Sequence, residues 1–230
     1  MIKSMITVLG YSQAQNVSRV VHLNNGIDCP IVGLGTGGHR AGGPPQDKVV
    51  IQMVHDAVEV GYRHIDTASN YFNEEAIGKA ITDLIATGKV KRQDMFITTK
   101  ITANETDSRA EALSGVHLAL QKLNTTYVDL MLIHRASNIS EVNDEVWKGL
   151  EEALSQKLVK SIGISNFDVS QMESLMKTAK VIPAMLQVES HPQENQNQLI
   201  KFCNQYNIRV TAYSPLGAGT LITNPTIGAI

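Results

Sequence analysis

Short apolar runs alternate with helix-type patterns along nearly the whole chain, and this alternation limits the possible folds more than any other feature of the sequence. About seven such runs recur at intervals of roughly 25 to 35 residues, each followed by apolar positions three or four apart. Parallel strands need a long crossover, usually a helix, so the alternation predicts βαβ units and a parallel sheet. The predicted strands are 31–36, 63–66, 95–100, 128–134, 161–164, 184–188 and 208–213, and the predicted helices include 47–61, 74–86, 169–177 and 198–206. A further helix is predicted with Leu113, Val116, His117 and Leu120 on its inward face, and another around Trp147 and Leu150.

Two parallel architectures compete. A doubly wound sheet needs a glycine-rich phosphate loop that leads into a helix, with an acidic residue at the next strand end. Residues 33–38 are rich in glycine but lack that spacing and that acid. A barrel instead predicts functional side chains at the carboxyl end of strand after strand. The strand ends carry such side chains, namely Asp66, Lys100, His134, Ser165, Asn166, Gln187 and Tyr213.

The sequence therefore predicts an α/β fold of the (β/α)8 barrel type. Apolar residues that lead into Asn25-Gly26, a strong hairpin signal, predict an N-terminal β-hairpin. Residues 1–18 are weakly patterned, and residues 19–230 are expected to form a single barrel domain, with no linker or low-complexity tract between its units.

Composition restricts the partners. The 230 residues carry a net charge of −2 and no basic cluster, which argues against nucleic acid or an anionic membrane surface. No apolar run approaches the roughly 18 residues of a membrane helix, and the first residues lack a signal-peptide core. Cys29 and Cys203 form neither a disulfide framework nor a metal motif, so free thiols in a cytoplasmic protein are expected.

Four titratable side chains are expected to meet at the barrel mouth: Asp66, Tyr71, Lys100 and His134. Taken singly, each has an ordinary structural explanation, such as a helix cap for Asp66. Together they suit protonation of an oxygen that develops negative charge. A lysine ammonium within about 4 Å is expected to lower the pKa of Tyr71 by a unit or more, with Asp66 orienting Lys100 and His134 donating to the substrate. An alternative is a Schiff-base enzyme with Lys100 as the nucleophile. The set contains no ligand spacing for a metal.

At these residues the chain resembles the aldo-keto reductase superfamily, which are NAD(P)H-dependent carbonyl reductases on a (β/α)8 barrel. The matching segments run in one order from near Leu23 to almost the end of the chain. They include Gly33-Leu34-Gly35-Thr36, Arg63-His64-Ile65-Asp66-Thr67-Ala68, Thr98-Thr99-Lys100, Leu132-Ile133-His134, Gly163-Ile164-Ser165-Asn166-Phe167, Gln187-Val188-Glu189 and Ala212-Tyr213-Ser214-Pro215-Leu216-Gly217.

The resemblance implies roles for individual residues. Asp66, Tyr71, Lys100 and His134 fall on the family's catalytic tetrad, with Tyr71 as proton donor. Ser165, Asn166 and Gln187 fall on positions that hold the nicotinamide carboxamide, and Tyr213 on the aromatic that stacks on its ring. Further cofactor contacts are implied for Thr36, Asp66, Ser214 and Leu216. The implied activity is reduction of aldehydes and ketones by a monomer that uses NADPH more readily than NAD and acts on a small-molecule carbonyl substrate.

Two departures from the family pattern stand out. Gly37, Thr102 and Arg135 occupy positions where many relatives have tryptophan, which weakens any expectation of a large hydrophobic substrate. Family members are usually longer than 230 residues, so the barrel is expected to lack its final βα unit or units, together with the Lys/Arg segment that favours NADP. The alternative hypothesis is a catalytically impaired truncated isoform or fragment, which acts as a binding protein or has no activity.

Overall fold

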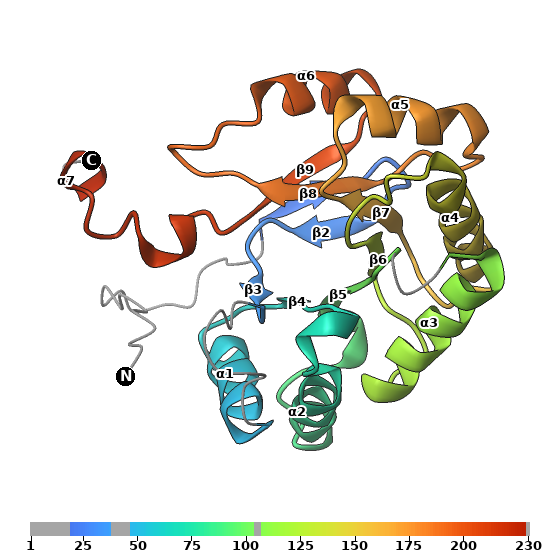
Figure 1. Cartoon of the computed structure of the whole chain (residues 1–230). Coiled ribbons are helices and arrows are strands. Elements are labelled where there is room, and N and C mark those ends of the chain that lie inside the picture. Colours follow the sequence, from blue (N-terminus) through green and yellow to red (C-terminus); the bar gives the residue numbers. More distant parts are fainter. Residues whose placement is uncertain (1–18, 38–46, 104–106, 229–230) are drawn as a thin grey trace.

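The computed structural model describes residues 19–37, 47–103 and 107–228, and its main feature is a seven-stranded parallel sheet curved into a barrel wall (Figure 1). The strands are hydrogen-bonded in chain order, without the reversal that marks a doubly wound sheet. They are β3 Leu34–Gly35, β4 His64–Asp66, β5 Phe96–Ile101, β6 Leu130–Ile133, β7 Ile162–Ser165, β8 Met185–Glu189 and β9 Arg209–Tyr213. The predicted barrel architecture is confirmed, whereas the predicted N-terminal segment 1–18 lies outside the described residues.

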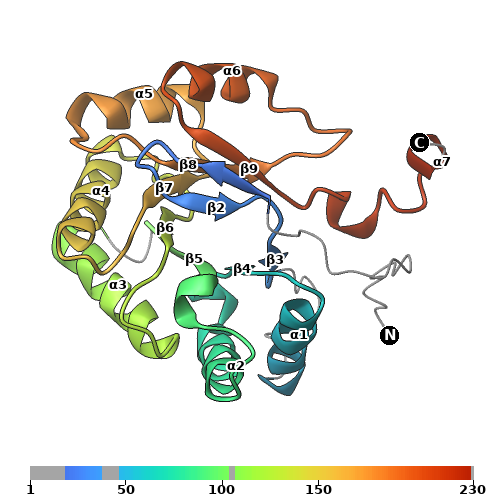
Figure 2. The same cartoon turned by 180° about the vertical axis from the view of Figure 1, so that it is seen from behind.

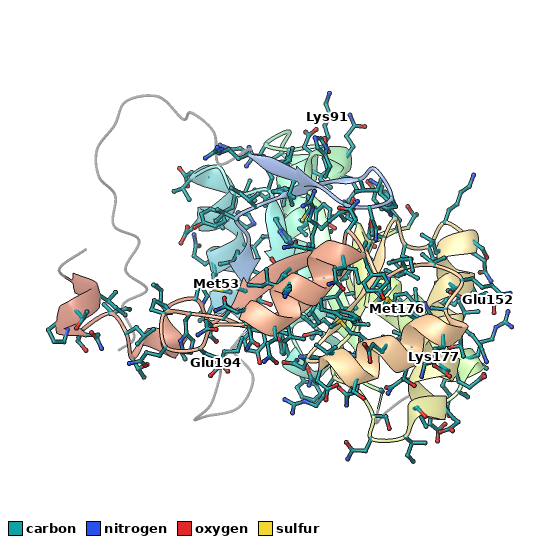
Figure 3. The ribbon with its side chains drawn as sticks, turned by 90° about the horizontal axis from the view of Figure 1, so that it is seen from above. Met53, Lys91, Glu152, Met176, Lys177 and Glu194 are labelled. Atoms are coloured by element: carbon teal, nitrogen blue, oxygen red, sulfur yellow. The ribbon has the colours of Figure 1, made fainter. Side chains whose placement is uncertain are left out.

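The helices lie outside the sheet, and the segment after β9 extends away to one side (Figures 1 and 2). They are α1 Asp47–Glu59, α2 Glu74–Ala86, α3 Arg109–Lys122, α4 Ser140–Ser155, α5 Val169–Thr178, α6 Asn197–Gln205 and α7 Pro225–Gly228, with 3-10 turns η1 Ser69–Tyr71, η2 Arg92–Asp94 and η3 Gly217–Gly219. Charged side chains such as Lys91, Lys177 and Glu194 project from the outer surface (Figure 3). No helix in the described ranges is both long and apolar enough to cross a membrane.

Two local predictions were wrong. Only Leu34–Gly35 of the predicted strand 31–36 joins the sheet, because the backbone N–H of Ile31 bonds to the carbonyl of Arg19 and so extends the hairpin instead. On α3, His117 is exposed, and the buried face is formed by Ala112, Val116, Ala119 and Leu120. Small residues are needed there because α4 approaches closely: a Cβ on Gly149 of α4 would lie 2.6 Å from the Cβ of Ala112.

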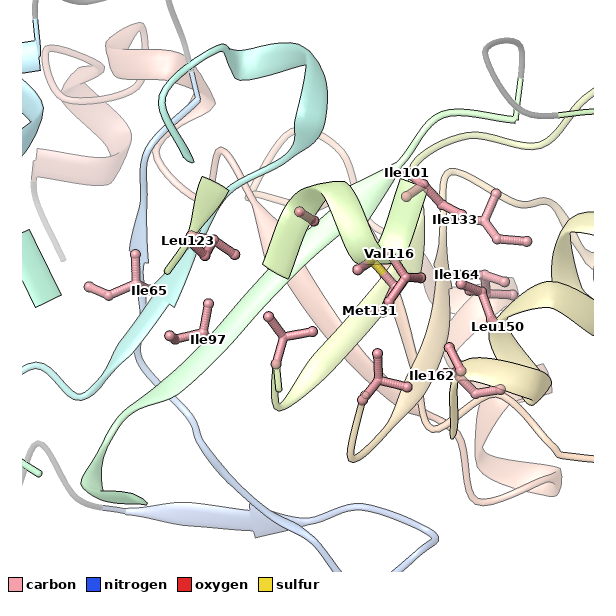
Figure 4. Packing of buried hydrophobic residues seen from close by; sticks show 14 of the residues in the cluster. Ile65, Ile97, Ile101, Val116, Leu123, Met131, Ile133, Leu150, Ile162 and Ile164 are labelled. Atoms are coloured by element: carbon pink, nitrogen blue, oxygen red, sulfur yellow. The ribbon is translucent and has the colours of Figure 1, made fainter. Parts of the chain in front are cut away.

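The apolar core has two parts, separated by the sheet. Alternate residues of β6 point to opposite sides, so Met131 and Ile133 join the larger cluster between sheet and helices (Figure 4), whereas Leu130 and Leu132 point into the barrel. Within the barrel these leucines pack with Phe96, and the cluster also includes the hairpin residues Leu23 and Cys29.

The hairpin of β1 Val20–His22 and β2 Asp28–Pro30 closes the amino-terminal end of the barrel. Its turn is held by side-chain amides: Asn24 Nδ2 donates to the carbonyl of Pro183 at 2.9 Å, and Asn25 Nδ2 donates to Ser161 Oγ at 3.0 Å. Ser161 immediately precedes β7, and Pro183 lies two residues before the start of β8. The carboxyl ends of the strands are therefore left as the accessible end of the barrel.

Both cysteines are buried free thiols, as predicted. Burial raises the pKa of Cys29 to about 12 and that of Cys203 to about 11. Both therefore remain uncharged thiols at neutral pH, which suits packing rather than redox chemistry.

Replacement of Gly78 in α2 tests how closely this helix packs on the next. Ala usually stabilises a helix interior by about 1 kcal/mol relative to Gly. A Cβ at Gly78 would, however, lie 2.6 Å from the backbone carbonyl oxygen of Lys122, which cannot easily move. We expect Gly78→Ala to lower the free energy of unfolding by about 1 kcal/mol or more, measured by urea denaturation. Lys79→Ala, at the exposed neighbouring position, is the control and should change it by less than about 0.5 kcal/mol. A stabilised Gly78→Ala variant would contradict the close contact.

Candidate active site

The residues predicted from strand ends lie together at the carboxyl end of the barrel. Asp66 is the last residue of β4, Ser165 of β7 and Tyr213 of β9, while Lys100 is one residue before the end of β5. His134 follows β6 directly, and its N–H bonds to the carbonyl of Ile101 at 2.7 Å. Since all the strands are parallel, these side chains share one rim.

An ion pair between Asp66 and Lys100 forms the centre of the site. Lys100 Nζ donates to Asp66 Oδ1 and, at 2.8 Å, to the carbonyl of Thr67, and the lysine side chain is 0% exposed. Gln187 Nε2 donates to the other carboxylate oxygen, Asp66 Oδ2, at 2.7 Å. The carboxylate therefore has a partner on each oxygen, from β5 and from β8. The predicted role of Asp66 in orienting Lys100 agrees with this geometry.

Tyr71, at the end of η1, lies between this pair and His134. Its ring meets that of His134 edge to face, with centroids 5.5 Å apart, and Lys100 Nζ lies 5.2 Å from its centroid. Burial, and secondly the charge of Asp66, raises the pKa of Tyr71 to about 12. The predicted lowering of this pKa was wrong, because burial and the Asp66 carboxylate shift it upward. The Tyr71 phenol is therefore protonated at neutral pH.

His134 is a neutral imidazole. Burial, and secondly the charge of Lys100, lowers its pKa to about 4. Its Nδ1 is buried and has no hydrogen-bond partner among the described residues. An unpaired lone pair is easier to bury than an unpaired N–H. We therefore assign the single proton of His134 to Nε2, which makes this atom a hydrogen-bond donor.

Gly37 provides the space in which Tyr71 lies. A Cβ at position 37 would be 2.6 Å from Cζ of Tyr71 and 3.0 Å from its hydroxyl oxygen. From the sequence, Gly37 stands out only as a departure from the family pattern. Its contact with Tyr71 could not be found from sequence, since it depends on how η1 folds back over β3.

A second hydrogen-bonded group joins the ends of β6 to β9 through Asn166. The Tyr213 hydroxyl donates to Asn166 Oδ1 at 2.9 Å, while Asn166 Nδ2 donates to the carbonyl of His134 at 2.9 Å and to Ser165 Oγ at 3.0 Å. The backbone N–H of Asn166 bonds to the carbonyl of Gln187 at 3.0 Å. Asn166 has a φ of +57°, a left-handed conformation that asparagine tolerates better than most residues. The structure thus brings four of the predicted cofactor-binding residues into one network.

The remaining predicted cofactor residues are placed less centrally. Thr36 is buried beside Asp66, and its Oγ1 donates to the Asp66 carbonyl at 3.0 Å. Ser214 and Leu216 follow β9, where Leu216 is 56% exposed. Within the described ranges neither has a hydrogen bond to Asp66 or Lys100.

The sequence did not reveal Asn73, which supports the site. Asn73 is buried, accepts a 2.6 Å hydrogen bond from Thr67 Oγ1 and donates to the carbonyl of Thr36 at 3.1 Å. It thereby holds the loops after β3 and β4 together. A polar residue before a helix suggests an N-cap, but the Asn73 side chain does not cap α2.

In the described part of the chain, no cluster of His, Cys, Asp or Glu has an arrangement suited to a metal ion.

Comparison with known proteins agrees with the fold and with the sequence motifs. A model of the Aldo/keto reductase family matches residues 31–229. This chain belongs to that family. Aldo-keto reductase AKR2E4 of Bombyx mori is 38% identical over 206 residues, covering 86% of this chain and 66% of the relative. Its crystal structure in complex with NADP superposes with a TM-score of 0.83 at 35% identity, covering 92% of this chain and 74% of that one.

A second aldo-keto reductase structure, AKR2E5 complexed with NADPH, matches with a TM-score of 0.81 at 33% identity. The match covers 92% of this chain and 70% of that one. The family resemblance predicted from the motifs is therefore confirmed, and the present chain spans 66% of the length of the Bombyx mori relative.

The protonation state of His134 can be measured directly. In the intact protein we expect its imidazole to titrate near pH 4 by NMR, far below an exposed histidine. Lys100→Met removes a positive charge and leaves the negative charge of Asp66, and both changes favour the imidazolium. The pKa of His134 should therefore rise in Lys100→Met, yet stay below 6.5 because burial is the larger cause. Titration of His134 at or above pH 6.5 in the unaltered protein would contradict this environment.

Substitution of Gly37 tests whether its missing side chain positions Tyr71. Gly37→Ala should displace the phenol from its buried place, so that its pKa falls from about 12 toward 10, as followed by ultraviolet difference titration. Gly35→Ala is a matched control two residues away, where a Cβ would meet nothing within 4 Å. The control should titrate like the unaltered protein, and an unchanged tyrosine titration in Gly37→Ala would refute the positioning role.

Proposed function

We propose that this protein is an NADPH-dependent oxidoreductase that reduces small aldehydes or ketones to alcohols, with Tyr71 as the proton donor. The observation that carries the proposal is the pairing of two neutral donors, the Tyr71 hydroxyl and His134, beside the buried Asp66–Lys100 pair. Such a set stabilises negative charge on a carbonyl oxygen and can then protonate it. The membership of the aldo/keto reductase family supports the same reaction class.

The residues present suit a nicotinamide cofactor. Ser165, Asn166 and Gln187 provide the hydroxyl and amide groups that a carboxamide can hydrogen-bond, and the Tyr213 ring provides an aromatic face beside them. We assign further cofactor contacts to Thr36, Asp66, Ser214 and Leu216. NADPH is preferred over NAD because the similar solved structures are complexes with NADP and NADPH. The bound cofactor would supply the hydride.

The protein's own groups then act on the substrate oxygen. His134 Nε2–H donates a hydrogen bond that places the carbonyl oxygen next to the Tyr71 hydroxyl. As this oxygen becomes an alkoxide, it is a stronger base than a tyrosinate, so the Tyr71 proton moves to it. The Lys100 charge beside the Tyr71 ring stabilises the phenolate that remains. Asp66 and Gln187 keep Lys100 in place during this transfer.

The alternative role of Lys100 as a Schiff-base nucleophile has less support. Its side chain is 0% exposed, and its ammonium donates to Asp66 and to the carbonyl of Thr67. A nucleophilic lysine needs a neutral amine that can reach the substrate. The expectations of a cytoplasmic monomer that binds neither nucleic acid nor membranes remain part of the proposal, supported by the net charge of −2 and the free thiols.

Tyr71→Phe tests the proposed proton donor. With NADPH and a panel of small aldehydes, we expect oxidation of NADPH, followed at its nicotinamide absorbance, to slow by about a hundredfold or more in Tyr71→Phe. Tyr206→Phe, at the exposed end of α6, is the matched control and should retain the full rate. Comparable rates in Tyr71→Phe and the unaltered protein would refute the assignment.

A thermal melt separates this proposal from a binding protein without activity. If NADPH raises Tm but no carbonyl compound is reduced, the non-catalytic alternative is favoured, because only a formed site stabilises the fold by mass action. If NADPH neither raises Tm nor is oxidised, the proposed cofactor is wrong.

A further inference from the structure

A cavity of about 300 Å³ lies between α2 and α3, which are neighbours outside the sheet (Figures 1 and 2). Its lining comes from η1 and the start of α2, from the end of β5 and from one face of α3. Ile101 on its wall belongs to the apolar cluster between sheet and helices (Figure 4), whereas the preceding residue, Lys100, bonds to Asp66 at the barrel mouth. Successive side chains of a strand point to opposite faces of the sheet. The cavity is therefore separate from the candidate active site and from the space assigned to the cofactor.

Glu74, the first residue of α2, brings a buried carboxyl group to this cavity. Its side chain belongs to a residue that is 2% exposed, and Oε1 accepts a 2.7 Å hydrogen bond from Thr99 Oγ1 on β5. Within the described ranges, the other oxygen, Oε2, has no hydrogen bond or ion pair. Burial raises the pKa of Glu74, while the Thr99 hydrogen bond and the charge of Lys122 oppose this rise. A hydrogen-bond donor that reached Oε2 would stabilise the carboxylate further, because a buried charge needs partners for its remaining acceptors.

Ser69 adds a second unsatisfied group to the same cavity. Its Oγ is buried and has no hydrogen-bond partner among the described residues. Most buried polar side-chain atoms have a partner, so two such groups on one cavity require an explanation. The lining also includes an apolar wall formed by Ile101, Leu118 and Ala119. An apolar wall with a few polar groups is the usual arrangement of a small-molecule site, and the volume lies at the lower end of the range of such sites.

The polar groups restrict the chemistry of the ligand. An anionic head group would bring a second negative charge beside Glu74, and a pure hydrocarbon would leave both polar groups unsatisfied. A cationic head group is disfavoured because Lys122 already places a positive charge near Glu74. A neutral group that both donates and accepts hydrogen bonds therefore suits the cavity best.

We propose that this cavity binds a small molecule that carries a primary carboxamide on an apolar body. The amide N–H donates to Glu74 Oε2, and the amide oxygen accepts from the Ser69 hydroxyl. The apolar body contacts Ile101 and Leu118. Binding requires neither the cofactor nor the Tyr71 hydroxyl, so the site is independent of the proposed reductase activity.

The test uses benzamide as the probe and benzoate as an anion of the same shape. Calorimetry gives the two Kd values, and the NMR signals of the Ile101 and Leu118 methyl groups locate the bound probe. We expect benzamide to shift both signals and to bind about tenfold or more tightly than benzoate. Saturation with NADPH should leave the Kd of benzamide unchanged, because the cavity lies outside the barrel.

Two variants test the two halves of the site. Glu74→Gln keeps an oxygen for Thr99 but replaces Oε2 by an NH₂ group, so it should weaken benzamide about tenfold or more and strengthen benzoate. Glu75→Gln makes the same change at the exposed neighbouring position and should alter neither Kd. Leu118→Asn removes apolar contact at a position that is 49% exposed, where the fold tolerates substitution, and should weaken both probes severalfold.

Three results would overturn the inference. In the first, benzamide leaves the Ile101 and Leu118 methyl signals unchanged, which is also the result for a cavity that holds only water. In the second, NADPH displaces benzamide, which would place the probe in the cofactor space. In the third, Glu74→Gln or Leu118→Asn binds benzamide as tightly as the unaltered protein does.

Discussion

The ion pair between Asp66 and Lys100 is the interaction on which the site depends. Removing two charges from water is costly, and a buried pair is stable only when the remaining hydrogen-bonding capacity of both partners is also satisfied. Here Thr67 and Gln187 complete the pair, and Thr36 fixes the backbone of Asp66 from β3. Asp66 therefore ties together the ends of strands β3, β4, β5 and β8, through its backbone carbonyl and its carboxylate.

This ion pair also sets the state of the neighbouring groups. An unpaired Lys100 would favour an ionised tyrosine beside it. Because Lys100 is paired with Asp66, burial is the largest cause of the pKa shifts of Tyr71 and His134. Both then remain neutral donors at physiological pH. In the proposed proton transfer from Tyr71, the Lys100 charge already lies next to the ring that becomes a phenolate. We propose that it stabilises this product more than the resting phenol, which favours the transition state.

The sequence was sufficient for the barrel and for the grouping of the strand-end residues at one rim, and insufficient for the electrostatics of the site. Strand ends in a parallel barrel must share a rim, so Asp66, Lys100 and His134 could be grouped from strand positions alone. The direction of the Tyr71 pKa could not, because it depends on the pairing of Lys100 and on burial. The roles of Gly37 and Asn73 could not be predicted from sequence for a related reason, because their contacts join loops that are distant along the chain. The exposed His117 shows that helical spacing alone does not decide which of two adjacent helix faces is buried. On α3 the buried face includes Ala112 and Ala119, whose small side chains allow close packing of the neighbouring helix.

The hairpin at the closed end of the barrel has a consequence for how the chain reaches its fold. Its side-chain contacts are among the most distant in sequence: Asn24 bonds 159 residues ahead to Pro183, and Arg209 bonds back 187 residues to His22. During synthesis the hairpin emerges before the strands that it covers, so the apolar cluster around Leu23 and Cys29 is completed only when Ala184 and Met185 of the β8 region have been made. Contacts of such separation form late, because the long loop must be closed before they contribute. The hairpin that closes the amino-terminal end of the barrel is thus synthesised first, and its contacts with the sheet are completed late. During that interval, the nascent chain exposes an apolar surface that a chaperone can recognise.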